Sequence, residues 1–385
     1  MNSKRIIPII IALLITAIPA KAVSAQEENA APAPADFQGQ PIELTFEKAF
    51  DIMTKDNITI IQAKLDKEAA KINIDKNEST ISDLNKIPGA TKEGSINYNN
   101  IKLLKLANEY LGSNAERNYQ ATVAGLKASL EQIYYGTLNA MRMIEINQEN
   151  LNNAILLDEK TKKKFELGLA VKKDILDSEY NVILAETKLD EAVNTLKKSK
   201  MLLNEKLGYD VMSNIQLKDR LNYEEIGDLN LEETVSNALG IRYEVKSVGF
   251  AYENEKINMD ITAAKYPDIT FAYKEQKVKL LEAEKNLQNI KRNIEIEIRS
   301  KYLDLIQKYK EIKAGEKSVQ LGEEALKITQ ISYDAGMAVQ TDVQKAQIAL
   351  QQARLGLIQT ELDYKMAYLE FMDSIGVGRI EAAGN

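Results

Sequence analysis

The strongest constraint on the fold of this chain is an internal duplication. The stretch Phe165–Gly208 aligns without a gap with Tyr333–Gly376, and the stretch Phe46–Asp75 aligns in the same way with Leu231–Asp260. The paired blocks follow the same order in both halves, which indicates two copies of one structural unit. Each copy is predicted to contain an opening helix, a variable middle segment, a long helix, a tight turn and a second long helix.

The segments that follow the two turns carry a seven-residue apolar pattern. A large apolar side chain recurs at every seventh position, and a small residue lies three positions after most of them; the large residues are Ile175, Val182, Leu189, Leu196 and Leu203, and then Val343, Leu350, Leu357, Tyr364 and Phe371. This pattern predicts long antiparallel helices of roughly 50 Å that meet at a heptad seam.

A second apolar stripe lies on another face of the later segment, at Ile348, Leu355, Leu362 and Leu369. A helix with two apolar stripes has neighbours on both sides, which favours a wall of helices. A simple antiparallel coiled coil is the alternative. The predicted fold class is therefore mainly all-α, an internally duplicated set of long antiparallel hairpins. At most short strands accompany them, with Ile42–Leu44 and Ile215–Leu217 as candidates.

Each copy has a tight turn between its two long helices, at Phe165–Asp174 and at Tyr333–Asp342. Its glycine, Gly168 or Gly336, is predicted to supply the left-handed residue that ends a helix. The aspartate that closes each turn is predicted to cap the next helix. Capping alone accounts for both turns as helical hairpins.

The composition argues against catalysis and against nucleic-acid binding. The sequence contains no Cys, no His and no Trp, so the usual ligands of zinc and copper are absent. Its 50 basic and 57 acidic side chains give a net charge of −7, and nucleic-acid partners require a basic surface. The carboxylates do not cluster with a nucleophile or a phosphate-binding loop. We expect no enzyme, no catalytic residue, no metal and no cofactor.

The N-terminus has the pattern of an export signal. Lys4 and Arg5 precede the apolar run Ile6–Ile18, and small residues at 23–25 offer a cleavage site. A membrane anchor is the alternative, but spanning a bilayer takes about 20 apolar residues. The predicted organisation is a signal peptide at 1–25, a flexible N-terminus at 26–40, repeat 1 at 41–208, a linker at 209–229, repeat 2 at 230–378 and a disordered tail at 379–385.

The duplicated pattern resembles the TolC family of outer-membrane efflux and secretion proteins. In that family each repeat has an opening Leu-Thr-x-x-x-Ala-like helix, here Leu44–Ala49. An aromatic-x-x-Gly turn and a long Ala-rich helix follow, and the latter ends at Leu207-Gly208 or Ile375-Gly376. The resemblance covers almost the whole chain after the signal.

The resemblance implies a homotrimer whose helices form a hollow tunnel. It further implies that a periplasmic adaptor docks at the hairpin turns and joins the tunnel to an inner-membrane pump. The implied docking residues are Gly168, Leu169, Val171, Gly336, Met337 and Val339, and the possible pore or cap carboxylates are Asp174, Asp177 and Asp342. Carboxylates in a narrow pore favour cations.

Two segments depart from the family pattern. Residues 76–100 are polar without strand-like alternation, and Tyr266–Tyr273 is one short strand-like stretch with no return strand. We therefore expect the helical tunnel without the membrane β-barrel strands. The expected function is a conduit of the cell envelope, in the outer membrane or periplasm, that exports small molecules or proteins. The alternative is a non-conducting structural coiled-coil scaffold of the envelope.

Overall fold

The computed structural model describes residues 37–378, except positions 56, 224 and 228. The chain divides into two units, Met1–Phe37 and Gln38–Asn385, and all described helices and strands lie in the second. The predicted signal peptide, most of the predicted flexible N-terminus and the predicted tail at 379–385 lie outside the described residues.

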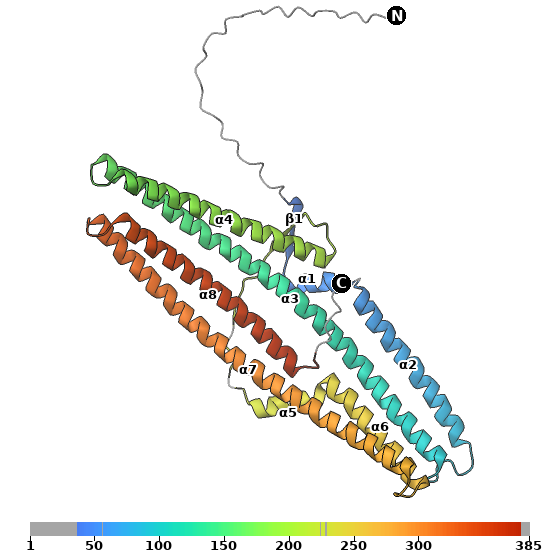
Figure 1. Cartoon of the computed structure of the whole chain (residues 1–385). Coiled ribbons are helices and arrows are strands. Elements are labelled where there is room, and N and C mark those ends of the chain that lie inside the picture. Colours follow the sequence, from blue (N-terminus) through green and yellow to red (C-terminus); the bar gives the residue numbers. More distant parts are fainter. Residues whose placement is uncertain (1–36, 56, 224, 228, 379–385) are drawn as a thin grey trace, which may run out of the picture. The chain divides into compact units, whose positions relative to one another are not determined.

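Helices dominate the described part of the chain, which confirms the mainly all-α prediction (Figure 1). The first copy contains β1 (Gln38–Leu44), α1 (Phe46–Lys55), α2 (Ile58–Asn85), α3 (Ile96–Glu166) and α4 (Lys172–Leu207). The second copy contains β2 (Ser213–Leu217), α5 (Leu231–Ile241), α6 (Tyr243–Lys265), α7 (Phe271–Asp334) and α8 (Gln340–Ile375).

The opening segment of each copy is two helices, whereas the sequence predicted one. In the first copy the Asn57 side chain accepts hydrogen bonds from the backbone N–H groups of Thr59 and Ile60, which starts α2 afresh. In the second copy Arg242, with φ −56° and ψ 130°, leaves the helical conformation between α5 and α6. Its buried guanidinium donates to Glu244 and to the Ser374 carbonyl, and these bonds fix the break.

The long helices form a wall, as the second apolar stripe predicted. α3 packs against α4 and α8, and α8 packs against α7, which gives the order α4–α3–α8–α7 (Figure 1). Beyond the ends of α4 and α8, α2 packs against α3 and α6 packs against α3 and α7. The order there is α2–α3–α6–α7, and the two longest helices run through both halves.

Two short strands tie the copies together, where the sequence predicted them. β1 and β2 pair in parallel, with Ile42 opposite Ile215 and Leu44 opposite Leu217. Leu44, Ile215 and Leu217 are buried in a core that also contains Tyr134 of α3 and Leu203 of α4. The pair thereby anchors the start of each copy to the first hairpin.

The two connections at the far end, away from the hairpin turns, are turns rather than strands. Residues 86–95 join α2 to α3, and residues 266–270 join α6 to α7. The strand-like interpretation of Tyr266–Tyr273 is wrong, because α7 already begins at Phe271. Thr270 caps it by accepting a hydrogen bond from the Tyr273 N–H. No helix in the described ranges has an apolar stretch long enough to cross a membrane.

Candidate functional site

The two hairpin turns have the same backbone geometry. Gly168 and Gly336 have φ of 73° and 75°, the left-handed conformation that glycine adopts without strain. The N–H of Gly168 donates to the Phe165 carbonyl at 2.9 Å, and that of Leu169 donates to the Lys164 carbonyl at 2.8 Å. Equivalent bonds close the second turn. The glycines therefore end their helices as the sequence predicted.

The aspartates of the turns are not the N-cap residues that the sequence predicted; they lie three positions later, inside the helices. The N-caps of α4 and α8 are Val171 and Val339, and the aspartates occupy the third position inside each helix. The Asp174 carboxylate accepts a hydrogen bond from the Val171 N–H at 3.0 Å, and Asp342 accepts one from Val339 at 3.3 Å. A valine has no side-chain acceptor, so only this half of a capping box can form.

Asp177, the third predicted carboxylate, has a different local role. Its Oδ2 lies 2.9 Å from Nζ of Lys173, one helical turn earlier. Such an exposed i, i+4 pair contributes little to stability, because solvent screens it. Asp174 and Asp342 are thus held by backbone donors, while Asp177 pairs with a lysine.

Each turn exposes apolar side chains to solvent. Leu167, Leu169 and Val171 are more than half exposed in the first turn, and Met337 and Val339 are equally exposed in the second. Clustered exposed apolar side chains mark interaction surfaces more often than isolated ones do. The sequence analysis named all of these residues except Leu167, whose counterpart in the second copy is alanine.

The two turns are fixed side by side by contacts between the ends of α3 and α7. Nζ of Lys160 lies 3.1 Å from Oδ2 of Asp334, and the hydroxyls of Thr161 and Tyr333 lie 3.2 Å apart. Nζ of Lys164 donates to the Tyr333 carbonyl and lies 3.4 Å from the centre of its ring. The described docking candidates therefore form one composite surface rather than two separate ones.

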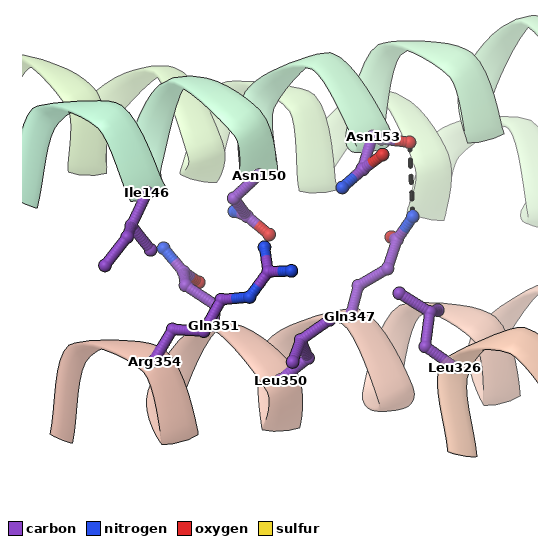
Figure 2. Close-up of a pocket in the computed structure, with 8 residues that line it drawn as sticks. All are labelled: Ile146, Asn150, Asn153, Leu326, Gln347, Leu350, Gln351 and Arg354. Atoms are coloured by element: carbon purple, nitrogen blue, oxygen red, sulfur yellow. Dashed lines mark hydrogen bonds between the residues drawn. The ribbon is translucent and has the colours of Figure 1, made fainter. Parts of the chain in front are cut away.

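A polar seam runs from these contacts along α3 and α8. Figure 2 shows Gln347 of α8 reaching across to α3, where its Nε2 donates to the Asn153 carbonyl at 3.2 Å. Further along, Nε2 of Gln351 donates to Oδ1 of Asn147 at 2.7 Å, and an ion pair joins Arg142 to Glu361. A cavity of about 10 Å³ between the two helices has room for one water molecule.

In residues 37–378, apart from the three omitted positions, no group of three or more acidic, His or Cys side chains is placed to hold a metal ion.

No protein-family model matches the sequence, and no curated protein matches it either. Solved structures do match. A membrane protein from Pseudomonas aeruginosa is 13% identical with a TM-score of 0.67, over 94% of this chain and 98% of that one. The outer membrane protein VceC from Vibrio cholerae is 13% identical with a TM-score of 0.65, over 86% and 96% of the two chains. This chain has the TolC-like fold. The Campylobacter jejuni CmeC outer membrane channel agrees, at 13% identity and a TM-score of 0.64, over 88% of this chain and 87% of that one.

The TolC-like fold brings the predicted turn residues together at one end of the wall. It also places them on helix ends that are joined by the polar seam, which the sequence analysis did not find. A signal for the seam was present, because Asn147, Asn150 and Asn153 repeat at helical spacing in α3, as Gln347 and Gln351 do in α8. Without the helix order, nothing in the sequence pairs those two rows.

Proposed function

We propose that copies of this chain join side by side into a helical conduit of the cell envelope. In this conduit three copies form the tunnel, an adaptor docks at the hairpin turns, and an inner-membrane pump supplies the exported small molecules or proteins. The observation that carries the proposal is two pairs of matching apolar faces on the outer edges of the wall.

The first pair of faces lies near the hairpin turns. On the α4 edge Leu176, Tyr180 and Ile183 are exposed, and their spacing puts them on one side of the helix. On the α7 edge the exposed residues are Leu321, Ile328 and Ile331. At 1.5 Å per residue, both rows lie roughly 5–20 Å from their turns. The two rows therefore occupy the same height on opposite edges.

The second pair of faces lies in the other half of the wall. There the outer helices are α2 and α7. Ile58, Ile61 and Leu65 are exposed on α2, and Ile296 and Leu303 are exposed on α7. Counted from the connections at the far end, the α2 row spans roughly 30–41 Å and the α7 row roughly 38–48 Å, so the two rows overlap at about 38–41 Å. Each edge thus carries a discontinuous apolar stripe along both halves of the unit.

Because the two edges are different surfaces, contact between copies is head-to-tail. Such heterologous contacts form a closed ring when the rotation between copies closes, and the family resemblance implies a ring of three. In that ring all hairpin turns gather at one rim. Asp174, Asp177 and Asp342 then lie just inside that rim, where they favour cations.

Disulfide crosslinking tests the ring directly, because the natural chain has no cysteine. In the double variant Ile183→Cys/Leu321→Cys the two thiols belong to opposite edges, with α3 and α8 between them. A disulfide needs Cα atoms within about 7 Å, so it cannot close inside one chain. We expect oxidation to yield covalent dimers and trimers and nothing larger.

The matched control is Lys188→Cys/Leu321→Cys, because Lys188 is exposed on a different side of α4. It should stay monomeric under the same oxidation. A failure of the first pair to crosslink, or a ladder that continues past three copies, would contradict the closed ring.

Docking is tested at the exposed turn residues. A photo-crosslinking amino acid at Leu169 or Met337 should capture a candidate adaptor in cells, whereas the same group at exposed Thr187 should not. The double variant Leu169→Asp/Met337→Asp should keep the covalent trimer and abolish the capture. Capture from Thr187 as efficient as from Leu169 would contradict docking at the turns.

A transport assay distinguishes the conduit hypothesis from the hypothesis of a non-conducting scaffold. Cells that lack this chain should accumulate a fluorescent efflux dye, and the natural chain should restore efflux where Leu169→Asp/Met337→Asp does not. An assembled ring whose removal leaves dye accumulation unchanged would favour the scaffold.

A further inference from the structure

The two hairpin turns share a backbone geometry but differ in charge. Residues 160–173 contain six lysines and one glutamate, whereas the equivalent residues 328–341 contain one aspartate and no basic side chain. At the six lysine positions the second copy has Ile, Gln, Ile, Ser, Gln and Thr. Both turns close with equivalent hydrogen bonds and the same left-handed glycine. The fold of a turn therefore does not require the lysines.

Four of the six lysines have partners within the chain. Lys162 and Lys173 each form an ion pair with a carboxylate of the first hairpin. Lys160 and Lys164 contact the end of α7. These four help to fix the first hairpin or to hold the two turns together.

The other two lysines have no such role. Lys163 and Lys172 are exposed, and their ammonium groups have no partner in the described part of the chain. Lys163 lies in the last turn of α3, where a positive charge suits the helix dipole. Lys172 is the first residue of α4, where a positive charge opposes the dipole. Helix stability thus accounts for Lys163 but not for Lys172.

The two unpaired lysines flank the exposed apolar side chains of the first turn. Leu167 and Leu169 are each 73% exposed, and both lie between Lys163 and Lys172 in the sequence. The second turn presents Met337 at 78% exposure without a lysine beside it. The first turn therefore combines apolar side chains with unpaired positive charge, whereas the apolar surface of the second turn carries none.

We propose that the first turn binds a protein segment that carries carboxylates beside apolar side chains, and that the second turn binds by apolar contact alone. This inference rests on the proposed docking of an adaptor at the turns, and it specifies the chemistry of the adaptor surface. Complementary charge steers association and selects among partners. An anionic bilayer also attracts lysines that lie beside leucines. It would present the same charge to both turns, however, and only one of these neighbouring turns is basic.

Binding of defined peptides tests the charge preference on the full chain. The probe is a fluorescent helical peptide with Glu-Leu-Leu-Glu at its centre, and its counterpart has Lys-Leu-Leu-Lys. Fluorescence anisotropy at low salt should show at least about tenfold tighter binding of the acidic peptide, and added NaCl should reduce the difference. The net charge of −7 opposes this preference, so the preference has to come from a local surface. Equal binding of the two peptides would overturn the proposal.

Charge reversal locates the binding surface. Lys163→Glu/Lys172→Glu should abolish the preference for the acidic peptide. Its turn should still fold, because the second copy closes the same turn without lysines. The matched control is Lys274→Glu/Lys277→Glu, which changes the net charge equally at exposed positions near the start of α7. Equal losses in the two variants would show that bulk charge decides, which contradicts binding at the first turn.

A vesicle experiment distinguishes a protein partner from a bilayer. The chain has no tryptophan, so Leu169→Trp places a single fluorophore in the first turn. Its emission should stay unchanged with phosphatidylglycerol vesicles. A shift to shorter wavelength that Lys163→Glu/Lys172→Glu removes would assign the lysines to an anionic bilayer and overturn the proposal.

Photo-crosslinking in cells connects the peptide result to the adaptor. The adaptor segment captured at Leu169 should contain Asp or Glu within about one helical turn of the crosslinked residue, and Lys163→Glu/Lys172→Glu should reduce the capture about tenfold. Capture that the charge reversal leaves unchanged would overturn the inference while docking at the turns stands. An intact peptide preference without any adaptor capture would instead overturn the docking and leave the acidic specificity of the first turn in place.

Discussion

The seam inside each hairpin and the seam between the hairpins are built from different side chains. Inside the second hairpin Leu305 of α7 and Tyr364 and Phe371 of α8 belong to a buried apolar cluster. Between the hairpins, amide side chains and ion pairs connect α3 to α8. The difference teaches that each hairpin is stabilised by apolar burial, which does not tolerate gaps. The boundary between hairpins is held mainly by polar groups, which water can replace, and near the turns Leu157 of α3 adds an apolar contact with the cluster of Leu326 and Tyr333.

The largest effect should come from an apolar residue inside a hairpin. Leu305 of α7 is completely buried in a cluster with Tyr364 and Phe371 of α8. Leu305→Ala should lower the free energy of unfolding by about 2–5 kcal/mol, through lost burial and a new cavity. Leu202→Ala, at an exposed position of α4 outside the proposed contact rows, should change it by less than about 0.5 kcal/mol. Chemical denaturation measures both, and equal losses would break the comparison.

The next effect tests how closely the two helices of a hairpin approach. A Cβ atom on Gly322 would lie 3.2 Å from the Cα of Leu350, whereas one on Gly356 would meet nothing within 4 Å. Gly322→Leu should therefore destabilise the second hairpin by about 1–3 kcal/mol. Gly356→Leu should stabilise it slightly, because leucine favours helix. A neutral Gly322→Leu, measured by thermal unfolding, would mean that the hairpin seam is loose.

An effect of similar size is expected at the seam between the hairpins. Gln351→Leu should cost about 1–3 kcal/mol, because the buried Asn147 loses the donor to its Oδ1. The double variant Asn147→Leu/Gln351→Leu should recover most of that loss, since neither polar group then lacks a partner. Hydrogen exchange in α3 and α8 reports both variants. If the single variant exchanges as the natural chain does, water already satisfies this seam.

The smallest effect concerns a carboxylate buried in the same seam. Burial raises the pKa of Glu131 above its ordinary value, while the charge of Lys127 on α3 acts in the opposite direction. On the α8 side, Asp373 adds to the rise in pKa and Lys365 opposes it. The folded state therefore holds the Glu131 proton more tightly than the unfolded state does. That contribution to stability is complete below about pH 4 and is lost as the pH rises through the folded-state pKa.

Replacing this carboxyl gives a test with a defined sign. Glu131→Gln should be more stable than the natural chain at neutral pH, and the difference should vanish below about pH 4. The control is Glu145→Gln, at an exposed position of the same helix. It removes one negative charge without changing a buried group. Thermal unfolding over a pH series measures both variants. A neutral-pH loss of stability in Glu131→Gln would mean that pairing with Lys127 outweighs burial.

Much of the fold follows from local sequence patterns. The duplication, the heptad positions, the left-handed glycines and the two short strands were all predicted. The opening helices were not predicted as broken, because the break at Arg242 depends on the Ser374 carbonyl at the end of α8. The cap was misplaced for a local reason, because valine is a poor N-cap residue and an aspartate suits both the N-cap and the third helical position, where Asp174 lies.

The candidate site also has features that the sequence predicts and features that it does not. The apolar residues of the turns could be named from the sequence, because helix ends and glycine turns are local features. The Thr161–Tyr333 contact could not, because it joins two helices that are distant along the chain. The exposed rows on α4 and α7 are equally hidden in the sequence, where they resemble any other apolar stripe.

The sequence by itself determined that this chain makes long paired helices twice, and where each pair turns. Periodicity, helix capping and glycine conformation act within a few residues, so they can be recognised without knowledge of any tertiary contact. Only the tertiary structure decided which helix faces meet, which seam is polar, and which edges and turns stay exposed. Those outcomes depend on side chains far apart in the sequence that become neighbours only when the helices pack.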